Sequence, residues 1–201
     1  MAPMFVTFEG VDGSGKSTQA ALLAEALRAE GRDVVAMREP GGTALGERVR
    51  ALLLGDGSIT PWAEAALFAA ARAQLVAEVI RPALARGADV VCDRFLDSSL
   101  AYQGIARGLG VETVLELSRA ATGGLLPDRT FLLLLPVEEA LRRGRGRPDR
   151  IEGEGPAFLA RVDEAYRELA GAFPGRVVAL DARRPPVELA DRIRSELRAL
   201  A

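Results

Sequence analysis

A glycine-rich segment near the amino terminus has the residue types and spacing that can hold a polyphosphate. It matches the pattern G-x-x-x-x-G-K-[ST] in full, as Gly10-Val11-Asp12-Gly13-Ser14-Gly15-Lys16-Ser17. Glycines let the backbone approach phosphate oxygens, and the first amide groups of a following helix attract their negative charge. Lys16 offers a compact positive charge, and Ser17 can ligate Mg²⁺. We therefore predict a nucleotide-binding loop (a P-loop); a glycine-rich turn with an exposed lysine is the alternative.

Lys16 is the only lysine among the 26 basic residues of this 201-residue chain. A lysine kept in such an arginine-rich sequence suggests a position that a planar guanidinium cannot fill. The chain has no histidine and one cysteine, which excludes histidine-dependent catalysis, histidine metal sites, internal disulfides and cysteine zinc clusters. The formal charge of −2 argues against a nucleic-acid partner, because general nucleic-acid binding normally shows a basic excess.

Nothing in the sequence indicates a membrane segment. No apolar run approaches the ~20 residues that a membrane-spanning helix needs. The start of the chain lacks the basic and apolar regions of a signal peptide. We therefore expect a cytoplasmic protein without a membrane partner.

Short apolar runs alternate along the chain with longer helical patterns. The expected strands are residues 5–8, 34–37, 90–92, 131–135 and 177–180. Their continuous apolar character is typical of parallel strands that helices cover on both faces. The first expected helix, residues 16–30, directly follows the strand and the glycine-rich segment, as a P-loop requires. The pattern predicts one α/β domain over residues 1–201 with a mainly parallel sheet.

The third expected strand is followed directly by Asp93-Arg94. This pair helps to distinguish between classes of nucleotide-binding protein. An ATPase that activates water would more often place two acids there. An arginine instead suggests that a second phosphate group is held nearby. The guanine-specific sequence N-K-x-D is impossible, because the chain has no second lysine.

Four motifs make the chain resemble the bacterial thymidylate kinases (dTMP kinases). They are FEGVDG at 8–13, REPGGT at 38–43, DRFLDSSLAYQG at 93–104 and DRIE at 149–152. They occur in the family's order and spacing over nearly the whole chain. The resemblance implies a nucleoside monophosphate kinase fold, with a five-stranded parallel sheet flanked by helices and a short lid at about 142–153. It also implies transfer of the γ-phosphoryl group of ATP to dTMP, giving dTDP and ADP, with Mg²⁺ as cofactor.

The residue types permit this reaction without a histidine. The acceptor is a phosphate monoester with a second pKa of ~6, so it is mostly a dianion at neutral pH and needs no side-chain base. The task is to bring two anions together and to neutralise charge during in-line transfer. Lysine, arginines and Mg²⁺ can do this.

The resemblance assigns ATP binding and the metal ion to particular positions. It implies that the ATP phosphates contact Gly10, Val11, Asp12, Gly13, Ser14, Gly15, Lys16, Ser17 and Thr18. It implies that Mg²⁺ binds at Ser17 and at Asp93, the latter directly or through water, with Glu39 as a further metal candidate. Lys16 is expected to act catalytically on the transferred phosphate.

The phosphate end of the dTMP site is assigned in the same way. By resemblance, Arg94 clamps the dTMP phosphate and has a catalytic role, while Glu39, Pro40 and Arg50 lie close to that phosphate. Asp12 corresponds to a catalytic carboxylate near the sugar 3′-hydroxyl and the metal. Arg94 in a structural ion pair, Arg50 on a solvated helix face and Asp12 as a turn-stabilising residue remain the simpler alternatives.

The base end of the dTMP site rests on residues four apart, which share a helix face. The resemblance implies that Phe68 stacks on thymine and that Arg72 donates to a base oxygen. Ser99 and Gln103 would read the thymine edge. Tyr102 would pack near the sugar, where its ring could disfavour a 2′-hydroxyl. A core phenylalanine, an exposed arginine and a purely structural tyrosine are the alternatives.

The arginine-rich segment at 142–150 corresponds to the lid that closes over ATP. We predict that Arg143, Arg147 or Arg150 acts as a catalytic arginine finger on the transferred phosphate, and that Asp149 and Glu152 orient these arginines. The P-loop interior carries no basic residue. The resemblance implies that in family members of this kind the lid supplies the catalytic arginine. A solvated basic loop is the alternative.

Other functions remain open at this stage. Another nucleoside monophosphate or deoxynucleoside kinase would share most of these motifs, and a non-catalytic nucleotide sensor would share the P-loop. A DNA-processing ATPase is disfavoured by the charge balance. The resemblance further implies a homodimer, and the apolar, alanine-rich stretch at 62–86 fits either a subunit interface or a deeply buried helix.

Overall fold

The apolar runs form one parallel sheet in the computed structural model, which describes residues 2–143 and 149–199. The strands are β1 (Phe5–Glu9), β2 (Val34–Arg38), β3 (Asp89–Asp93), β4 (Arg129–Leu134) and β5 (Val177–Asp181). Their order is β2-β3-β1-β4-β5, which confirms the predicted α/β fold with a five-stranded parallel sheet. The strands extend one or two residues beyond the apolar runs, because the backbone hydrogen bonds continue into polar positions. At its carboxyl end, β4 stops one residue before the end of its expected run.

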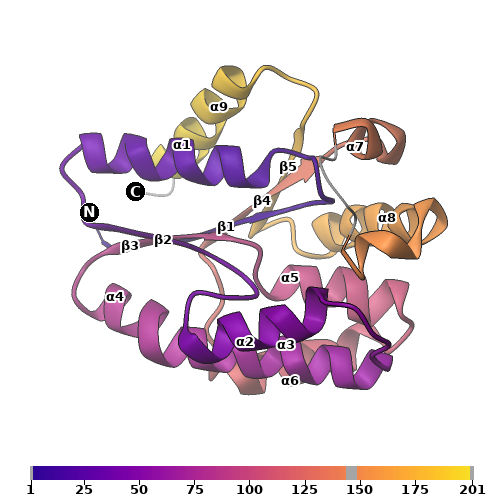
Figure 1. Ribbon diagram of the computed structural model, residues 1–201. Helices are drawn as coiled ribbons and strands as arrows, with labels where there is room; N and C mark the ends of the chain where they lie inside the picture. Colours follow the sequence, from indigo (N-terminus) through magenta and orange to yellow (C-terminus); the bar gives the residue numbers. More distant parts are fainter. Residues whose placement is uncertain (1, 144–148, 200–201) are drawn as a thin grey trace.

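Helices cover both faces of this sheet, which explains why its strands are apolar without alternation (Figure 1). One face carries α1 (Lys16–Ala29) and α9 (Pro186–Arg198). The other face carries α2 (Ala44–Leu54), α3 (Pro61–Leu75), α4 (Arg81–Ala85), α5 (Leu96–Ser99) and α6 (Val111–Thr122). Two further helices, α7 (Val137–Arg143) and α8 (Pro156–Ala172), follow β4 in the chain.

The stretch expected to be one helix over residues 62–86 is interrupted. After α3 comes a π-helical segment, η1 (Val76–Ile80), and α4 begins only at Arg81. Pro82 has no amide hydrogen and cannot donate to the carbonyl four residues before it, so regular α-helical bonding cannot continue through it. The wider π turn accommodates this irregularity.

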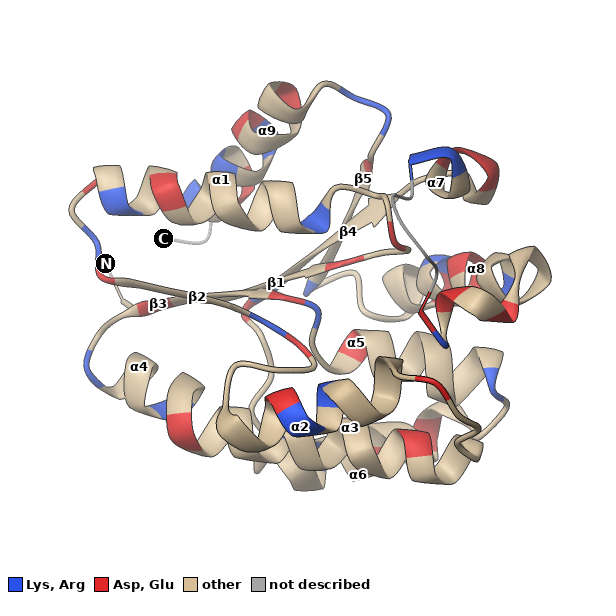
Figure 2. Cartoon of the chain, in the orientation of Figure 1, with Lys and Arg blue, Asp and Glu red and all other residues tan. Residues whose placement is uncertain are grey.

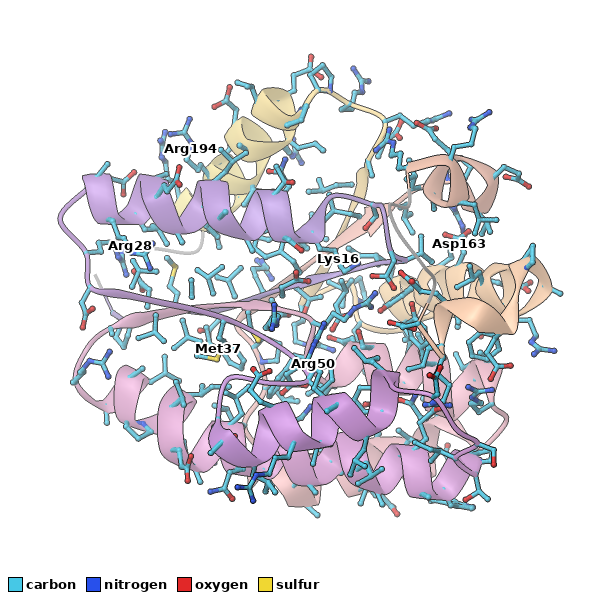
Figure 3. The ribbon with its side chains drawn as sticks, viewed as in Figure 1. Lys16, Arg28, Met37, Arg50, Asp163 and Arg194 are labelled. Carbon is cyan, nitrogen blue, oxygen red and sulfur yellow. The ribbon has the colours of Figure 1, made fainter. Side chains whose placement is uncertain are left out.

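The loops that follow β1, β2 and β3 meet at one edge of the sheet. The register pairs both Phe8 and Arg38 with Asp93, so the residues after these positions are neighbours in space. Parallel α/β sheets bind ligands at this carboxyl edge. Figure 3 shows Lys16 approaching the edge from the α1 side and Arg50 from the α2 side.

The expected lid at 142–153 is only partly within the described residues. Residues 142 and 143 end α7, and residues 149–151 lead into a short 3-10 helix, η3 (Glu152–Glu154). The positions between them lie outside the described part of the chain.

Acidic and basic positions are mixed along the outer helices, among them α1, α8 and α9 (Figure 2). This mixing agrees with the formal charge of −2. Within residues 2–143 and 149–199, no helix combines the length and the apolar character needed to cross a membrane.

Candidate active site

Lys16 is buried at the start of α1, inside the P-loop. Its side chain is 5% exposed, and its Nζ donates to the carbonyl oxygen of Val11 at 2.9 Å and to Oδ1 of Asp12 at 3.4 Å. Burial lowers the pKa of Lys16, and the charge of Arg94 lowers it further, while Asp12 opposes this shift. The loop thus holds a desolvated amino group beside the amide groups that open α1.

The P-loop packs directly against α7. Gly13 has a φ of 81°, and a Cβ atom on it would lie 2.7 Å from the carbonyl oxygen of Ala140 and 3.4 Å from the Cβ of Arg143. A larger residue would therefore displace α7 or strain the loop. This contact places Arg143, at the end of α7, next to the P-loop.

Ser17 and Asp93, the two main metal candidates, meet across the carboxyl edge. The Ser17 hydroxyl donates to Oδ2 of Asp93. The second carboxylate oxygen, Oδ1 of Asp93, is buried and has no hydrogen-bond partner among the described residues. Oxygen ligands of this kind suit Mg²⁺, which usually takes one or two protein oxygens and completes its shell with phosphates and water. The described residues hold no cluster of three or more acidic or thiol ligands, so the site does not resemble an all-protein metal cage.

A pocket of about 190 Å³ opens beside the P-loop. It brings together nine of the ten residues expected to bind dTMP. They are Asp12, Glu39, Pro40, Arg50, Phe68, Arg94, Ser99, Tyr102 and Gln103. Arg50 donates to the carbonyl oxygen of Pro40 at 3.0 Å, and burial lowers its pKa, so it belongs to the pocket wall and not to a solvated helix face.

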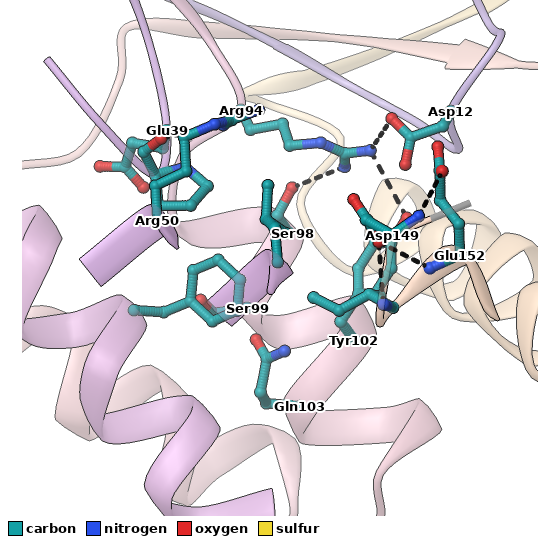
Figure 4. Close-up of a pocket in the computed structure, with 14 residues that line it drawn as sticks. Asp12, Glu39, Arg50, Arg94, Ser98, Ser99, Tyr102, Gln103, Asp149 and Glu152 are labelled. Atoms are coloured by element: carbon teal, nitrogen blue, oxygen red, sulfur yellow. Dashed lines mark hydrogen bonds and ion pairs between the residues drawn. The ribbon is translucent and has the colours of Figure 1, made fainter. Parts of the chain in front are cut away.

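Arg94 joins the P-loop to this pocket. Its Nη2 donates to Oδ1 of Asp12 at 2.8 Å, and its Nη1 donates to Oγ of Ser98 at 3.1 Å (Figure 4). Burial acts to raise the pKa of Asp12, but the charges of Arg94 and Lys16 outweigh it and hold that pKa well below its usual range. Asp12 is therefore an anion that contacts both cations. The structural ion pair that was the simpler alternative for Arg94 is thus present, with Asp12 as its partner.

Glu39 and Arg72 form a buried ion pair behind the pocket. Nε of Arg72 donates to Oε2 of Glu39 at 2.8 Å, and Nη2 donates to Oγ of Ser99 and to the carbonyl oxygen of Phe95, both at 3.1 Å. Arg72 is 1% exposed and supports the wall through Ser99 and Glu39. Burial raises the pKa of Glu39, although Arg72 opposes the shift.

The base-end residues lie on α3 and on the turns that follow β3. Phe68 is on α3, Ser99 ends α5, and a π-helical segment, η2 (Leu100–Ala106), carries Tyr102 and Gln103. Nε2 of Gln103 donates to Oε1 of the buried Glu64 at 2.8 Å, which turns its carbonyl oxygen away from that carboxylate. Burial raises the pKa of Tyr102 to about 12, so its hydroxyl stays protonated.

The lid arginines occupy different surroundings. Arg143 pairs with Glu139 at 2.5 Å and donates to the carbonyl oxygen of Ala182 at 3.3 Å. Arg150 pairs with buried Glu64 at 2.6 Å, at the base end of the pocket and not at the P-loop. Arg147 lies outside the described residues.

Several residues that shape this site had not been singled out from the sequence. Leu54, Ser98 and Ile151 line the pocket, and Asp149 and Glu152, expected only to orient arginines, line it too. Leu54 lies four residues after Arg50 on α2, so helical spacing could have found it. Ser98 lies four residues after Arg94 and next to Ser99 in the 93–104 motif, so the same motif could have found it. Residues 149–152 reach the pocket from a distant part of the chain, which no local pattern reports.

Comparisons with known proteins identify similar sequences and a similar fold. Residues 8–193 match the family model "Thymidylate kinase". The chain is 51% identical over 190 residues to a thymidylate kinase of Synechococcus sp. (strain JA-2-3B'a(2-13)), which covers 94% of this chain and 92% of the relative. It is 50% identical over 204 residues to a thymidylate kinase of Desulforudis audaxviator, covering 100% and 92%. A crystal structure of thymidylate kinase from Ehrlichia chaffeensis superposes with a TM-score of 0.76 at 35% identity, covering 90% of this chain and 93% of that one.

Proposed function

Because the chain belongs to the thymidylate kinase family and phosphorylates dTMP with ATP, we propose that its two cations, Lys16 and Arg94, hold the two reacting phosphates. One observation carries this proposal: Oδ1 of Asp12 accepts from Nζ of Lys16 at 3.4 Å and from Nη2 of Arg94 at 2.8 Å. The cation of the ATP site and the cation of the dTMP site thus meet at one oxygen atom. Phosphates bound to each would be close enough for direct transfer.

In this arrangement Asp12 keeps the two cations in place before the nucleotides bind. The dTMP phosphate takes over the guanidinium of Arg94, with Arg50 and Pro40 closing that end of the pocket. Asp12 then turns to the sugar 3′-hydroxyl. The acceptor phosphate is already a dianion, so the step needs positioning and charge neutralisation and no general base.

Kinases of this family use a divalent metal ion with ATP, and we propose that Ser17 and Asp93 hold Mg²⁺ here. The unpartnered Oδ1 of Asp93 and the neighbouring Ser17 hydroxyl support this assignment. When bound, the metal neutralises phosphate charge. Glu39 also has a buried oxygen, Oε1, without a partner among the described residues, but it is the weaker candidate because its charge is already neutralised by the buried ion pair with Arg72.

Thymine is proposed to lie between Phe68 and the residues of α5 and η2. Ser99 and Gln103 face the same pocket as Phe68, and Arg72 fixes the Ser99 hydroxyl from behind. The carbonyl oxygen of Gln103 suits the N3–H donor of thymine and would meet an acceptor at N3 of cytosine. The site should therefore prefer dTMP to dCMP.

A homodimer and a cytoplasmic location stay predictions. Exposed apolar side chains at the start of α3 and on α2, Trp62 at 51% and Leu52 at 61%, fit a subunit contact. Sedimentation of the purified protein decides its oligomeric state.

Phosphoryl transfer to a panel of acceptors tests the proposed function. The purified chain with ATP and Mg²⁺ is expected to convert dTMP to dTDP, with lower kcat/KM on dUMP, dCMP and dGMP, and to stop when the metal is chelated. A coupled assay for ADP measures this. Preferred transfer to another nucleotide would support a different monophosphate kinase. Nucleotide binding without transfer to dTMP, with any divalent metal, would contradict the proposal in favour of a sensor.

We predict that Arg94→Ala weakens dTMP binding by about 10²-fold, because two charge-assisted hydrogen bonds of roughly 1.5 kcal/mol each are lost. Affinity for ATP should change little. Calorimetric titration of both nucleotides measures the effect, and Arg48→Ala, which removes an exposed arginine of α2, is the matched control. Equal losses for the two nucleotides would argue against a clamp on dTMP.

A further inference from the structure

Glu9, the last residue of β1, is fully buried behind the wall of the pocket. Its Oε1 accepts from the backbone amides of Phe95 at 2.8 Å and Ser98 at 3.2 Å. Its Oε2 accepts from the hydroxyls of Ser98 at 2.5 Å and Tyr166 at 2.8 Å. All four donors belong to the segment directly after Arg94 or to α8. A buried carboxylate with this many donors fixes their positions.

The same two hydroxyls also accept hydrogen bonds from the guanidinium of Arg94. Nη1 of Arg94 donates to Oγ of Ser98 at 3.1 Å and to the hydroxyl of Tyr166 at 3.2 Å. A hydroxyl has one proton to donate and two lone pairs to accept with. The two hydroxyls also lie 3.0 Å from each other, but the charged carboxylate of Glu9 is the stronger acceptor for both protons, which leaves their lone pairs for Arg94. Glu9 therefore acts on the guanidinium through two relays, from β1 and from α8.

The backbone of Arg94 needs such support. Its φ of 71° lies in the left-handed region, which costs free energy for any residue with a side chain. The amide groups of Phe95 and Ser98, bound to Glu9, hold the chain immediately after this residue. Removing these bonds frees both the backbone and the side chain of Arg94 to relax.

We propose that Glu9 is a positioning residue that pre-orients Arg94 for the phosphate of the acceptor nucleotide, acting through Ser98 and Tyr166. The proposal rests on the role assigned above to Arg94. It predicts that Glu9 contributes to the recognition of the phosphate and not of the nucleoside. Thymidine, which has the base and sugar of dTMP but no phosphate, separates the two.

The test is the ratio of the Kd for thymidine to the Kd for dTMP, measured by calorimetry at pH 8. Burial raises the pKa of Glu9 to about 7, so at this pH the carboxylate form predominates. Glu9→Gln is expected to lower the ratio by about tenfold, since the amide has one accepting oxygen, and its NH2 group would face either the two hydroxyls or the two backbone amides that now donate to Glu9. Tyr166→Phe removes one relay and should lower it by about threefold. Thymidine affinity should stay near the wild-type value in both.

Asp97→Asn is the matched control. Asp97 is a buried carboxylate on α5 whose oxygens pair with Arg176 and accept from Thr130, with neither relay involved. Its substitution should leave the ratio unchanged. A ratio lowered equally in Asp97→Asn would overturn the proposal, because the effect would then be general loosening of the fold.

The outcomes separate this proposal from the function on which it rests. If Arg94→Ala lowers the ratio while Glu9→Gln and Tyr166→Phe keep the wild-type value, the role of Glu9 is wrong and the clamp stands. If Arg94→Ala also keeps the wild-type ratio, the clamp itself is wrong. Should Glu9→Gln fail to fold, Tyr166→Phe alone decides, because it retains the carboxylate and its amide bonds.

Discussion

Lys16→Met is expected to lower kcat for phosphoryl transfer from ATP to dTMP by about 10²- to 10³-fold, the usual loss when one charge-stabilising donor of a transition state is removed. Lys16 is 5% exposed and its Nζ is held by Val11 and Asp12, so water does not screen its charge. The charge that develops on the transferred phosphate would then lose a fixed cation. Single-turnover transfer measures the chemical step directly, and dTMP affinity is expected to change little.

Lys16→Arg is the informative control, because it keeps the positive charge. We expect it to recover little of the lost rate: a guanidinium is longer and planar, and the loop leaves space for a compact ammonium between Val11 and Asp12. The chain uses arginine at each of its other basic positions, so arginine would be the substitution most easily tolerated if charge alone mattered. A Lys16→Arg enzyme within about tenfold of the wild-type kcat, roughly 1.4 kcal/mol, would contradict this interpretation of the lone lysine.

The sheet could be predicted because each of its strands is signalled by a short contiguous stretch of sequence. A strand covered on both faces needs an unbroken apolar run, and residues 90–92 and 177–180 are such runs. The π segment at Val76–Ile80 could not be predicted in the same way, because its apolar and alanine residues also suit an α-helix. Only the position of Pro82 signals that the helix must adjust, and it does not say how.

The residues of the site also differ in whether a local sequence pattern predicts them. Asp12, Lys16 and Arg94 lie in or next to contiguous motifs, and parallel β-α connections bring such loops to one edge of the sheet. The contacts of Glu9 with Tyr166 and of Arg150 with Glu64 join residues 157 and 86 positions apart. Pairs of this kind depend on how α8 and α3 pack on the sheet, so no spacing rule in the sequence reveals them.

The second large expected effect is the loss of kcat when a lid arginine is removed. The structure distinguishes Arg143 from Arg150. Arg143 lies against Gly13 of the P-loop, whereas Arg150 is held by the buried carboxylate of Glu64 and by the carbonyl oxygen of Leu53 at 2.8 Å. We therefore expect Arg143→Ala to lower kcat by about 10³-fold, the lower end of the contribution of an arginine finger. Arg150→Ala should lower it by less than about tenfold and should raise KM for dTMP instead.

The measurement is kcat under saturating ATP and dTMP. Arg150→Ala is the matched control for Arg143→Ala, because each substitution removes one guanidinium from the same lid. Arg147→Ala belongs in the same series, since its position was also expected to reach the transferred phosphate. The finger needs a side chain that can leave its present partners when ATP binds. The partly exposed pair of Arg143 with Glu139 is held far less firmly than the buried pair of Arg150 with Glu64. If kcat falls by less than about tenfold in both Arg143→Ala and Arg147→Ala, neither arginine is the finger. A large loss of kcat in Arg150→Ala would instead mean that the ion pair of Arg150 with Glu64 breaks when the lid closes.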